Sequence, residues 1–280
     1  MIKTLKAGLI GLPLSKSLSP EIFRIFAALT GASITYELRE CAAAELTAVI
    51  ASLRAEGWAG FNATIPHKQT VFRLLDLSDP ASRGIRSVNA VRFGSRGLEG
   101  LNTDTTAVTE TLEENGAGSA GKTAVIFGSG GAAAAAGWAL GSSGAASVTF
   151  NSRNPAEAVE LAERYGKAFP KTIFSAAEFS APCASATILV NATPLGMYVP
   201  GMPPCAPAPG TICLDLAYAP GGTEFMASAR EAGAPALDGL EVLVRQASLS
   251  LKFWTGLPDG DTVKFNREAT ELLRKKLKGA

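Results

Sequence analysis

Two charged residues stand where a proton could pass to or from a bound molecule. Lys68 falls in the first turn of a helix expected to start near His67, where a positive charge opposes the helix dipole. Asp104 lies just before a helix expected to start at Thr105. Because an ammonium group near a carboxylate can exchange a proton with a substrate hydroxyl, Lys68 and Asp104 are predicted to act as a pair. A solvated lysine and a helix-capping aspartate are the alternatives.

Hydrogen-bonding side chains accompany both charges. Asn62 shares the segment that carries Lys68, and Asn102 is expected on the same face of an extended segment as Asp104. His67 should point about 100° away from Lys68 around the helix, which predicts a surface residue. Neutral polar groups of this kind suit a ligand that carries several hydroxyls.

Two serines precede the helix that is expected to start near Pro20. Ser19 and Pro20 form a good N-cap and N1 pair, which leaves Ser17 unexplained by capping. Two hydroxyls beside a helix N-terminus are also suited to a carboxylate. Ser17 and Ser19 are therefore candidate ligands of an anionic group.

A glycine cluster between an apolar run and strong helix formers has the outline of a dinucleotide-binding turn. Residues 125–127 predict a buried strand, Gly128 allows a tight turn, and Gly130 leaves backbone N–H groups open to a pyrophosphate. Ala133 takes the third position of the pattern, where a small residue lets helix and strand pack closely. The following helix would direct its positive end at the phosphates. A plain strand–turn–helix corner is the alternative.

The next expected strand, residues 147–151, indicates which dinucleotide is bound. An NAD enzyme usually carries an acid at the end of this strand to bind the ribose 2′-hydroxyl, and the sequence has none there. The chain instead reads Asn151-Ser-Arg-Asn154, in which Arg153 can bind a 2′-phosphate in bidentate fashion. The sequence therefore favours NADP over NAD. Arg153 as a solvated residue before Pro155 is the alternative.

The elements that must position these residues alternate along the chain. Short apolar strands and helical stretches follow one another, which predicts an α/β fold of parallel βαβ units, with a turn at Gly94–Gly97 between two short strands. A chain of 280 residues is expected to form two domains. We predict an N-terminal α/β substrate domain over residues 1–103, completed by residues 240–280, and a Rossmann-type dinucleotide-binding domain over residues 104–239. The C-terminal helices lack intervening strands and are expected to pack back on the first domain.

Composition and charge narrow the classes of partner and location. A net charge of +1 does not indicate a nucleic-acid or membrane-surface binder, so a small molecule is the expected partner. No apolar run approaches the roughly 20 residues of a membrane helix, and glycine and proline interrupt any N-terminal signal segment. A homodimer is compatible with these features. The expected location is the cytoplasm.

The four cysteines, Cys41, Cys183, Cys205 and Cys213, lie far apart in the sequence. They form no C-x-x-C motif, and the chain has one histidine, so no metal site is expected. Scattered single cysteines fit a reducing compartment better than a disulfide framework.

Several motifs in order resemble those of the shikimate dehydrogenase family, and the resemblance covers nearly the whole chain. The matching segments are Ser17-Leu-Ser-Pro20, Asn62 through Lys68, Val88-Asn89-Ala90, Asn102-Thr103-Asp104, Asn191 through Met197, Asp215-Leu-Ala-Tyr218, and Gly239 through Gly256. The resemblance implies NADP-dependent, reversible reduction of 3-dehydroshikimate to shikimate, a step of the chorismate pathway to the aromatic amino acids.

The resemblance also implies roles for individual residues. Lys68 and Asp104 would act at the reacting hydroxyl. The substrate-binding residues would be Ser17, Ser19, Thr64, Asn89, Tyr218 and Gln246. The cofactor-binding residues would be Gly128, Ser129, Gly130, Gly131, Ala132, Asn151, Ser152, Arg153, Leu216 and Gly239.

The chain departs from the family pattern at several positions. Lys16 stands where histidine is common, and Phe23-Arg24 replaces a usual His-Asn pair. Ala90 and Ala107 stand where threonine and glycine are usual. The arginine of the usual Asn-Arg-Thr signature is shifted by one, to Arg153. The alternatives are therefore a quinate, aminoshikimate or NAD-using paralogue, or a non-catalytic NADP-sensing module.

Overall fold

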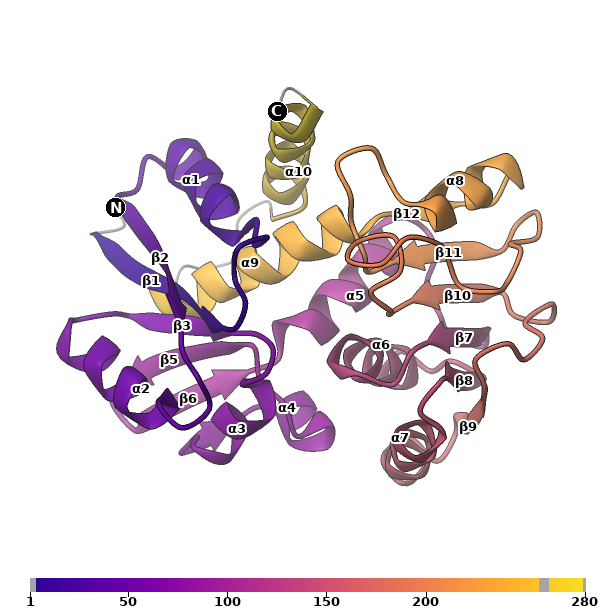
Figure 1. The fold of residues 1–280 in the computed structure, drawn as a ribbon, viewed down its shortest axis with the longest axis horizontal. Coiled ribbons are helices and arrows are strands. Elements are labelled where there is room, and N and C mark those ends of the chain that lie inside the picture. The colour runs from indigo at the N-terminus through magenta and orange to yellow at the C-terminus, as the bar shows by residue number, and fades with distance from the viewer. Residues whose placement is uncertain (1–3, 257–261, 279–280) are drawn as a thin grey trace. The chain divides into compact units, whose positions relative to one another are not determined.

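The computed structural model describes residues 4–256 and 262–278. Over this part of the chain two compact units form, each around a sheet of six strands (Figure 1). The first unit is Met1–Thr103 with Val244–Ala280, and the second is Asp104–Leu243. Residues 1–3, 257–261 and 279–280 of the predicted first domain lie outside the described residues. Strands and helices alternate, and the α/β prediction is confirmed.

The sheet of the first unit is mixed. Its order is β2-β1-β3-β5-β6-β4, with β1 parallel to β2 and β3, and β5 antiparallel to β3 and β6. The predicted turn joins β5 to β6 as a hairpin, in which Gly97 has a φ of 109° that other residues rarely adopt. The predicted turn between two short strands is therefore confirmed, and the sheet that contains it is mixed rather than wholly parallel. The strands are β1 (Leu5–Gly11), β2 (Ile34–Glu40), β3 (Gly60–Ala63), β4 (Leu77–Ser78), β5 (Ala90–Gly94) and β6 (Gly97–Leu101).

Helices cover this sheet, and the C-terminal helices complete its unit as predicted. Trp254 on α9 donates its indole N–H to the Val91 carbonyl at 2.8 Å. On α10, Phe265 lies 5.0 Å from the ring of Phe26 on α1, and Lys276 pairs with Glu21. Aromatic contact and indole hydrogen bonding therefore hold the end of the chain against its beginning. The helices are α1 (Ser19–Thr30), α2 (Leu46–Ala55), α3 (Lys68–Arg73), α4 (Pro80–Ile85), α9 (Gly239–Thr255) and α10 (Thr262–Lys278).

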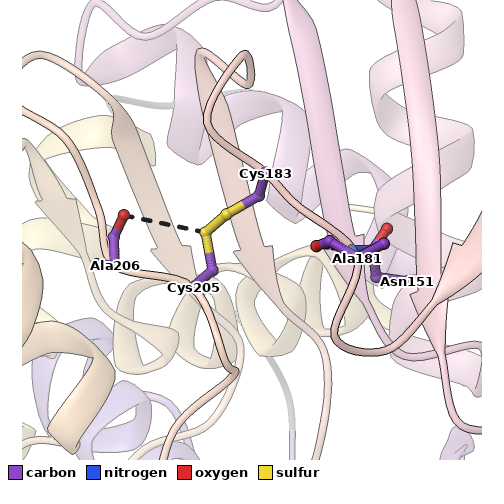
Figure 2. The surroundings of a disulfide bond; sticks show 5 residues. All are labelled: Asn151, Ala181, Cys183, Cys205 and Ala206. Atoms are coloured by element: carbon purple, nitrogen blue, oxygen red, sulfur yellow. Dashed lines mark hydrogen bonds between the residues drawn. A yellow bond between two sulfur atoms is a disulfide. The ribbon is translucent and has the colours of Figure 1, made fainter.

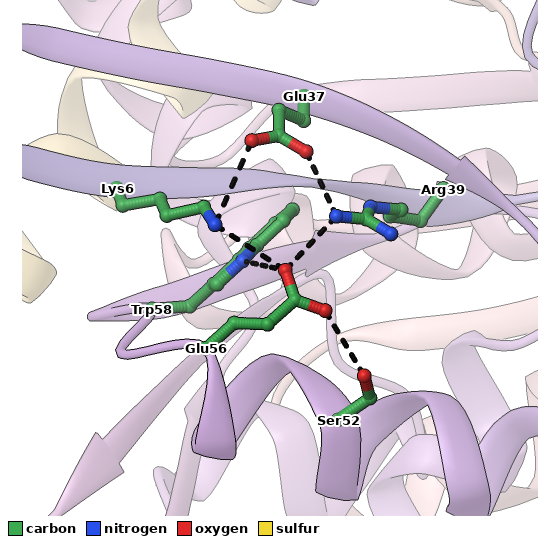
Figure 3. A network of polar contacts seen from close by, with 6 residues as sticks. All are labelled: Lys6, Glu37, Arg39, Ser52, Glu56 and Trp58. Carbon is green, nitrogen blue, oxygen red and sulfur yellow. Dashed lines mark hydrogen bonds and ion pairs between the residues drawn. The ribbon is translucent and has the colours of Figure 1, made fainter.

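A network of charges ties the end of α2 to β1 and β2 (Figure 3). Glu56 accepts from Arg39 at 2.9 Å, from the Trp58 indole at 3.1 Å and from Lys6 at 3.3 Å. Glu37 completes it through ion pairs to Arg39 at 2.9 Å and Lys6 at 3.8 Å. These groups are partly exposed and pair with one another, so the network is a structural feature of the surface.

The second unit has the doubly wound arrangement of a Rossmann-type fold. Its parallel sheet has the order β12-β11-β10-β7-β8-β9. The strand order therefore reverses between β7 and β10: β8 and β9 follow on one side of β7, and β10, β11 and β12 follow on the other. Ligands of such sheets bind at this reversal, beyond the carboxyl ends of the strands. The strands are β7 (Thr123–Phe127), β8 (Ser147–Ser152), β9 (Ile173–Glu178), β10 (Ile188–Asn191), β11 (Ile212–Asp215) and β12 (Ala236–Leu237). The helices are α5 (Thr103–Glu114), α6 (Gly131–Ser142), α7 (Pro155–Ala168) and α8 (Glu224–Glu231).

A disulfide joins Cys183 to Cys205, so the expectation of scattered single cysteines is wrong for this pair (Figure 2). The two Cα atoms lie 6.4 Å apart, within the range that a disulfide spans. Cys183 precedes β10 and Cys205 follows it, so the disulfide joins the segments on either side of this strand. Sequence spacing alone does not reveal such a pairing. Cys41 and Cys213 are buried free thiols.

Two properties of the described residues bear on membrane and metal binding. Within residues 4–256 and 262–278, no helix has the length and apolar character needed to cross a membrane. Over the same residues, no group of three or more His, Cys, Asp or Glu side chains is arranged to hold a metal ion.

Candidate active site

Lys68 is the first residue of α3, directly after a turn that follows β3. The His67 N–H donates to the Thr64 carbonyl at 2.7 Å and closes this turn. The Val88 N–H donates to the Lys68 carbonyl at 3.2 Å, which ties the helix start to the segment before β5. Lys68 and Thr64 are both half-buried. The backbone around the predicted proton donor is therefore held on two sides.

His67 is fully buried, and its prediction as a surface residue is wrong. Its Nε2 lies 2.9 Å from the Cys41 carbonyl oxygen and 3.6 Å from the Cys41 sulfur. His67 stands four residues before Val71, which is also fully buried, so both face the sheet. The angle of about 100° between the His67 and Lys68 side chains follows from helix geometry. The sequence did not show which of these two side chains faces the core. His67 therefore anchors the start of α3.

At the start of α1, Ser17 and not Ser19 has the side chain that accepts a backbone N–H. The helix begins at Ser19, and its N-cap is Leu18, which makes no side-chain cap. The Ser17 hydroxyl instead accepts the Ser19 N–H at 3.3 Å. The interpretation of Ser19 as the N-cap is therefore wrong by one residue. The Ser19 side chain is buried. Capping does not account for the Ser19 hydroxyl.

A buried amide network in the first unit joins residues from several elements. The Asn62 amide donates to the Asn89 carbonyl and to the Ser250 hydroxyl, both at 2.8 Å. The Asn89 amide donates to Thr103 Oγ1 at 2.8 Å and lies 3.5 Å from Gln246 Oε1. Buried polar groups with this many partners are held in one arrangement. The predicted residues Asn89 and Gln246 are therefore brought together.

Tyr36 on β2 belongs to the same network, and sequence analysis missed it. Its hydroxyl donates to Asn62 Oδ1 at 2.9 Å. Burial raises the pKa of Tyr36, an effect that a hydrogen bond with the Ser19 side chain partly offsets. A tyrosine within a strand pattern carries no signal beyond its strand, so only the fold connects it to Ser19.

Asp104 lies in the first turn of α5, which begins at Thr103. The expectation of an extended segment through Asp104 is wrong, because the helix starts two residues earlier than predicted. Asn102 is buried and donates to the Ser87 carbonyl at 3.1 Å. Asp104 is half-buried.

The glycine turn of the second unit follows β7 as predicted. Gly128 has a φ of 116°, and a Cβ there would lie 3.0 Å from the Ala192 carbonyl oxygen. A Cβ at Gly130 or Gly131 would meet nothing within 4 Å, so internal packing does not require glycine at either position. The bare backbone at the N-terminus of α6 is thus open to a ligand, and its N–H groups suit a pyrophosphate. The residues present fit a dinucleotide.

The end of β8 carries two buried candidates, Asn151 and Ser152, and the exposed Arg153 follows it. Asn151 is buried, and its amide donates to the Ala181 carbonyl at 3.1 Å (Figure 2). Arg153 is exposed, and its guanidinium lies 5.7 Å from the centre of the Phe179 ring. A cation–π contact at this distance adds a weak attraction to the ring, and the N–H groups of an exposed guanidinium suit a phosphate.

Polar residues also end β10 and β11. The fully buried Asp215 accepts from Asn191 at 2.8 Å, from the Ala217 N–H at 2.9 Å and from Thr223. A Cβ at Gly239 would lie 2.7 Å from the Ala217 carbonyl oxygen, so the chain approaches this loop too closely for a side chain. Asp215 therefore organises the loop that carries Leu216 and Tyr218.

Tyr218 is half-buried, and burial, followed by the nearby Tyr198, raises its pKa to about 12. A tyrosine with this pKa keeps its proton and can donate a hydrogen bond.

The free energy of unfolding should fall as the pH rises from about 4 to 6, because the buried Asp215 carboxyl ionises in this range. Desolvation raises its pKa from 3.8 to about 6, against the opposing hydrogen bonds, so the folded chain binds more protons than the unfolded chain in this window. Stability is then highest below the unfolded pKa and falls as the pH passes the folded one, by at most about 3 kcal/mol. Asp215→Asn should flatten this slope in denaturant unfolding at a series of pH values. Equal slopes would contradict the assignment.

Comparison with known proteins bears on the family of the chain. The model of the shikimate dehydrogenase substrate binding domain matches residues 9–91. Over 257 residues the chain is 36% identical to the shikimate dehydrogenase (NADP(+)) of Moorella thermoacetica. The aligned region covers 89% of this chain and 87% of the relative.

Solved structures share the fold over almost the full length. Shikimate 5-dehydrogenase of Thermus thermophilus, in complex with shikimate, has a TM-score of 0.83 at 30% identity and covers 98% of this chain and 99% of its own. The ligand-free 5-ketofructose reductase of Gluconobacter sp. strain CHM43 has a TM-score of 0.86 at 28% identity and covers 96% of this chain and 99% of its own. The resemblance read from the motifs is confirmed. The chain belongs to the shikimate dehydrogenase family.

Proposed function

We propose that this protein is an NADP-dependent shikimate dehydrogenase that reversibly reduces 3-dehydroshikimate to shikimate in the chorismate pathway. The observation that carries the proposal is the 36% identity to a shikimate dehydrogenase (NADP(+)) over 89% of the chain. The open glycine turn at Gly130 and Gly131 supports a dinucleotide, and the buried amide network supports a ligand with several hydroxyls.

The two units divide the work in this proposal. The first unit, predicted as residues 1–103 with residues 240–280, supplies most of the substrate contacts, and the second, predicted as residues 104–239, binds the cofactor. Ser17 and Ser19 hold the carboxylate, while Thr64, Asn89, Tyr218 and Gln246 contact substrate hydroxyls and carboxylate. The pyrophosphate lies on residues 128–132, and Leu216 and Gly239 flank the nicotinamide. Asn151, Ser152 and Arg153 form the 2′-phosphate end.

The protein's own part in the reaction is positioning and proton transfer. When bound, NADPH supplies the hydride that reduces the ketone. In the reducing direction Lys68 protonates the developing alkoxide, and in the oxidising direction it accepts the hydroxyl proton. Asp104 acts at the same hydroxyl.

A substrate panel tests the function. Shikimate, quinate, an aminated analogue and 5-ketofructose are assayed with both cofactors in the matching direction of hydride transfer. Shikimate is expected to be turned over best, because a buried polar group left unpaired by an analogue costs about 1–3 kcal/mol. Turnover of 5-ketofructose without shikimate would instead favour the activity named for the Gluconobacter neighbour. Cofactor binding without any turnover would favour the sensing module.

Arg153→Ala should erode the preference for NADP. Hydrogen bonds to a charged group contribute about 1.5–3 kcal/mol, so kcat/KM with NADP should fall roughly 10- to 150-fold. The same quantity with NAD should change little, because NAD lacks the 2′-phosphate. Steady-state kinetics with both cofactors measures the two values. Equal losses, or a wild type that prefers NAD, would contradict the role of Arg153.

We also propose a cytoplasmic location and a homodimer. Cell fractionation tests the first, and light scattering of the purified protein tests the second. The Cys183–Cys205 disulfide is unusual for the cytoplasm, where thiol pools keep most cysteines reduced. Alkylation in intact cells measures the redox state of these two cysteines, and a disulfide that persists there would count against the cytoplasmic proposal.

A further inference from the structure

Three side chains from separate elements of the second unit meet beside the glycine turn. Ser129 Oγ, in the turn after β7, lies 2.9 Å from Ser152 Oγ at the end of β8. The same Ser129 oxygen lies 2.9 Å from Glu157 Oε2, in the first turn of α7. A carboxylate therefore stands next to two residues predicted to bind the cofactor, although sequence found no acid at the end of β8.

The chemistry of the three groups gives the hydrogen bonds a direction. A carboxylate only accepts, so Ser129 donates its single hydroxyl proton to Glu157. Ser152 then donates to Ser129, and its own oxygen accepts the Asn154 N–H at 3.0 Å. Both serine protons are engaged in a chain that ends on Glu157. Neither hydroxyl is left as a donor to a phosphate while this chain is formed.

We infer that Glu157 is a specificity-determining residue that favours a ribose 2′-hydroxyl over a 2′-phosphate. A hydroxyl can donate to the Glu157 carboxylate, which is the interaction that acids at this end of a dinucleotide site make with NAD. A 2′-phosphate brings negative charge to the same place and is repelled. The inference rests on the proposed dinucleotide site and deepens it. The protein uses NAD as well as NADP, with a preference set by two opposed charges, Arg153 and Glu157.

The test compares Glu157→Gln with Glu163→Gln. The first variant removes the charge and keeps the shape, and the second removes an exposed charge six residues further along the same helix. Calorimetric titration with NADP+ and NAD+ gives Kd values that need no substrate, and kcat/KM with shikimate gives a second readout. Glu157→Gln should raise the NADP-to-NAD preference at least tenfold, which corresponds to about 1.4 kcal/mol. Glu163→Gln should change it less than twofold.

Salt gives a further check on the electrostatic cause. The effect of Glu157→Gln on NADP+ binding should shrink as ionic strength rises, because salt screens charges near the surface. An unchanged preference, an equal change for both cofactors, or an equal effect of Glu163→Gln would overturn the inference. If the Kd values shift as expected and shikimate is not turned over, the proposed function fails and the role of Glu157 stands.

Discussion

Lys68→Ala is expected to lower kcat for shikimate oxidation by about 10²- to 10⁴-fold, the usual contribution of a general acid–base group. KM should change less, because proton transfer matters in the transition state more than in the bound ground state. Steady-state kinetics with saturating NADP+ and varied shikimate separates the two parameters. A variant with near-normal kcat would show that Lys68 is not the proton-transfer group.

A control on the same helix separates chemistry from folding. Arg73 is an exposed cation at the end of α3, and its guanidinium donates to Thr70 at 3.2 Å. Arg73→Gln should leave kcat within about twofold, since surface substitutions rarely change stability by more than about 0.5 kcal/mol. If both variants lost activity together, a damaged α3 rather than proton transfer would be the cause.

Asp104→Asn is expected to lower kcat/KM for shikimate by about 10²-fold or more while the fold persists. The substitution keeps the size of the side chain and removes the charge proposed to act at the reacting hydroxyl. As an acid in the first turn of α5, Asp104 also stabilises the helix through its dipole, an effect of about 0.3–1 kcal/mol. Denaturant unfolding should therefore show a small loss of stability beside a large loss of activity.

Glu113→Gln is the matched control for this variant, because Glu113 is an exposed acid near the other end of α5. It should leave both kinetics and stability close to those of the wild type. If Asp104→Asn lost stability but kept its kcat/KM, Asp104 would stabilise the helix and have no role at the reacting hydroxyl.

The sequence determined the features that depend on neighbours along the chain. An apolar strand, Gly128 and a run of helix formers predict the turn at the start of α6, and the turn adopts the positive φ that glycine allows. The alternation of strand and helix patterns likewise predicts the α/β class. Boundaries were less well determined. Helices α1 and α5 start one or two residues from their expected starts, because residues near a helix end can take either helical or extended backbone angles.

Tertiary structure alone decided which distant residues meet and which faces are buried. His67 is buried because the sheet lies on the side of α3 that also carries Val71. Cys183 meets Cys205 across β10, and Glu157 reaches Ser129 from the next helix. Periodicity gives the angle between side chains on one element, but it does not say what lies opposite each of them. Those partners depend on the order of the strands in the sheet. Interactions between residues far apart in the sequence determine that order.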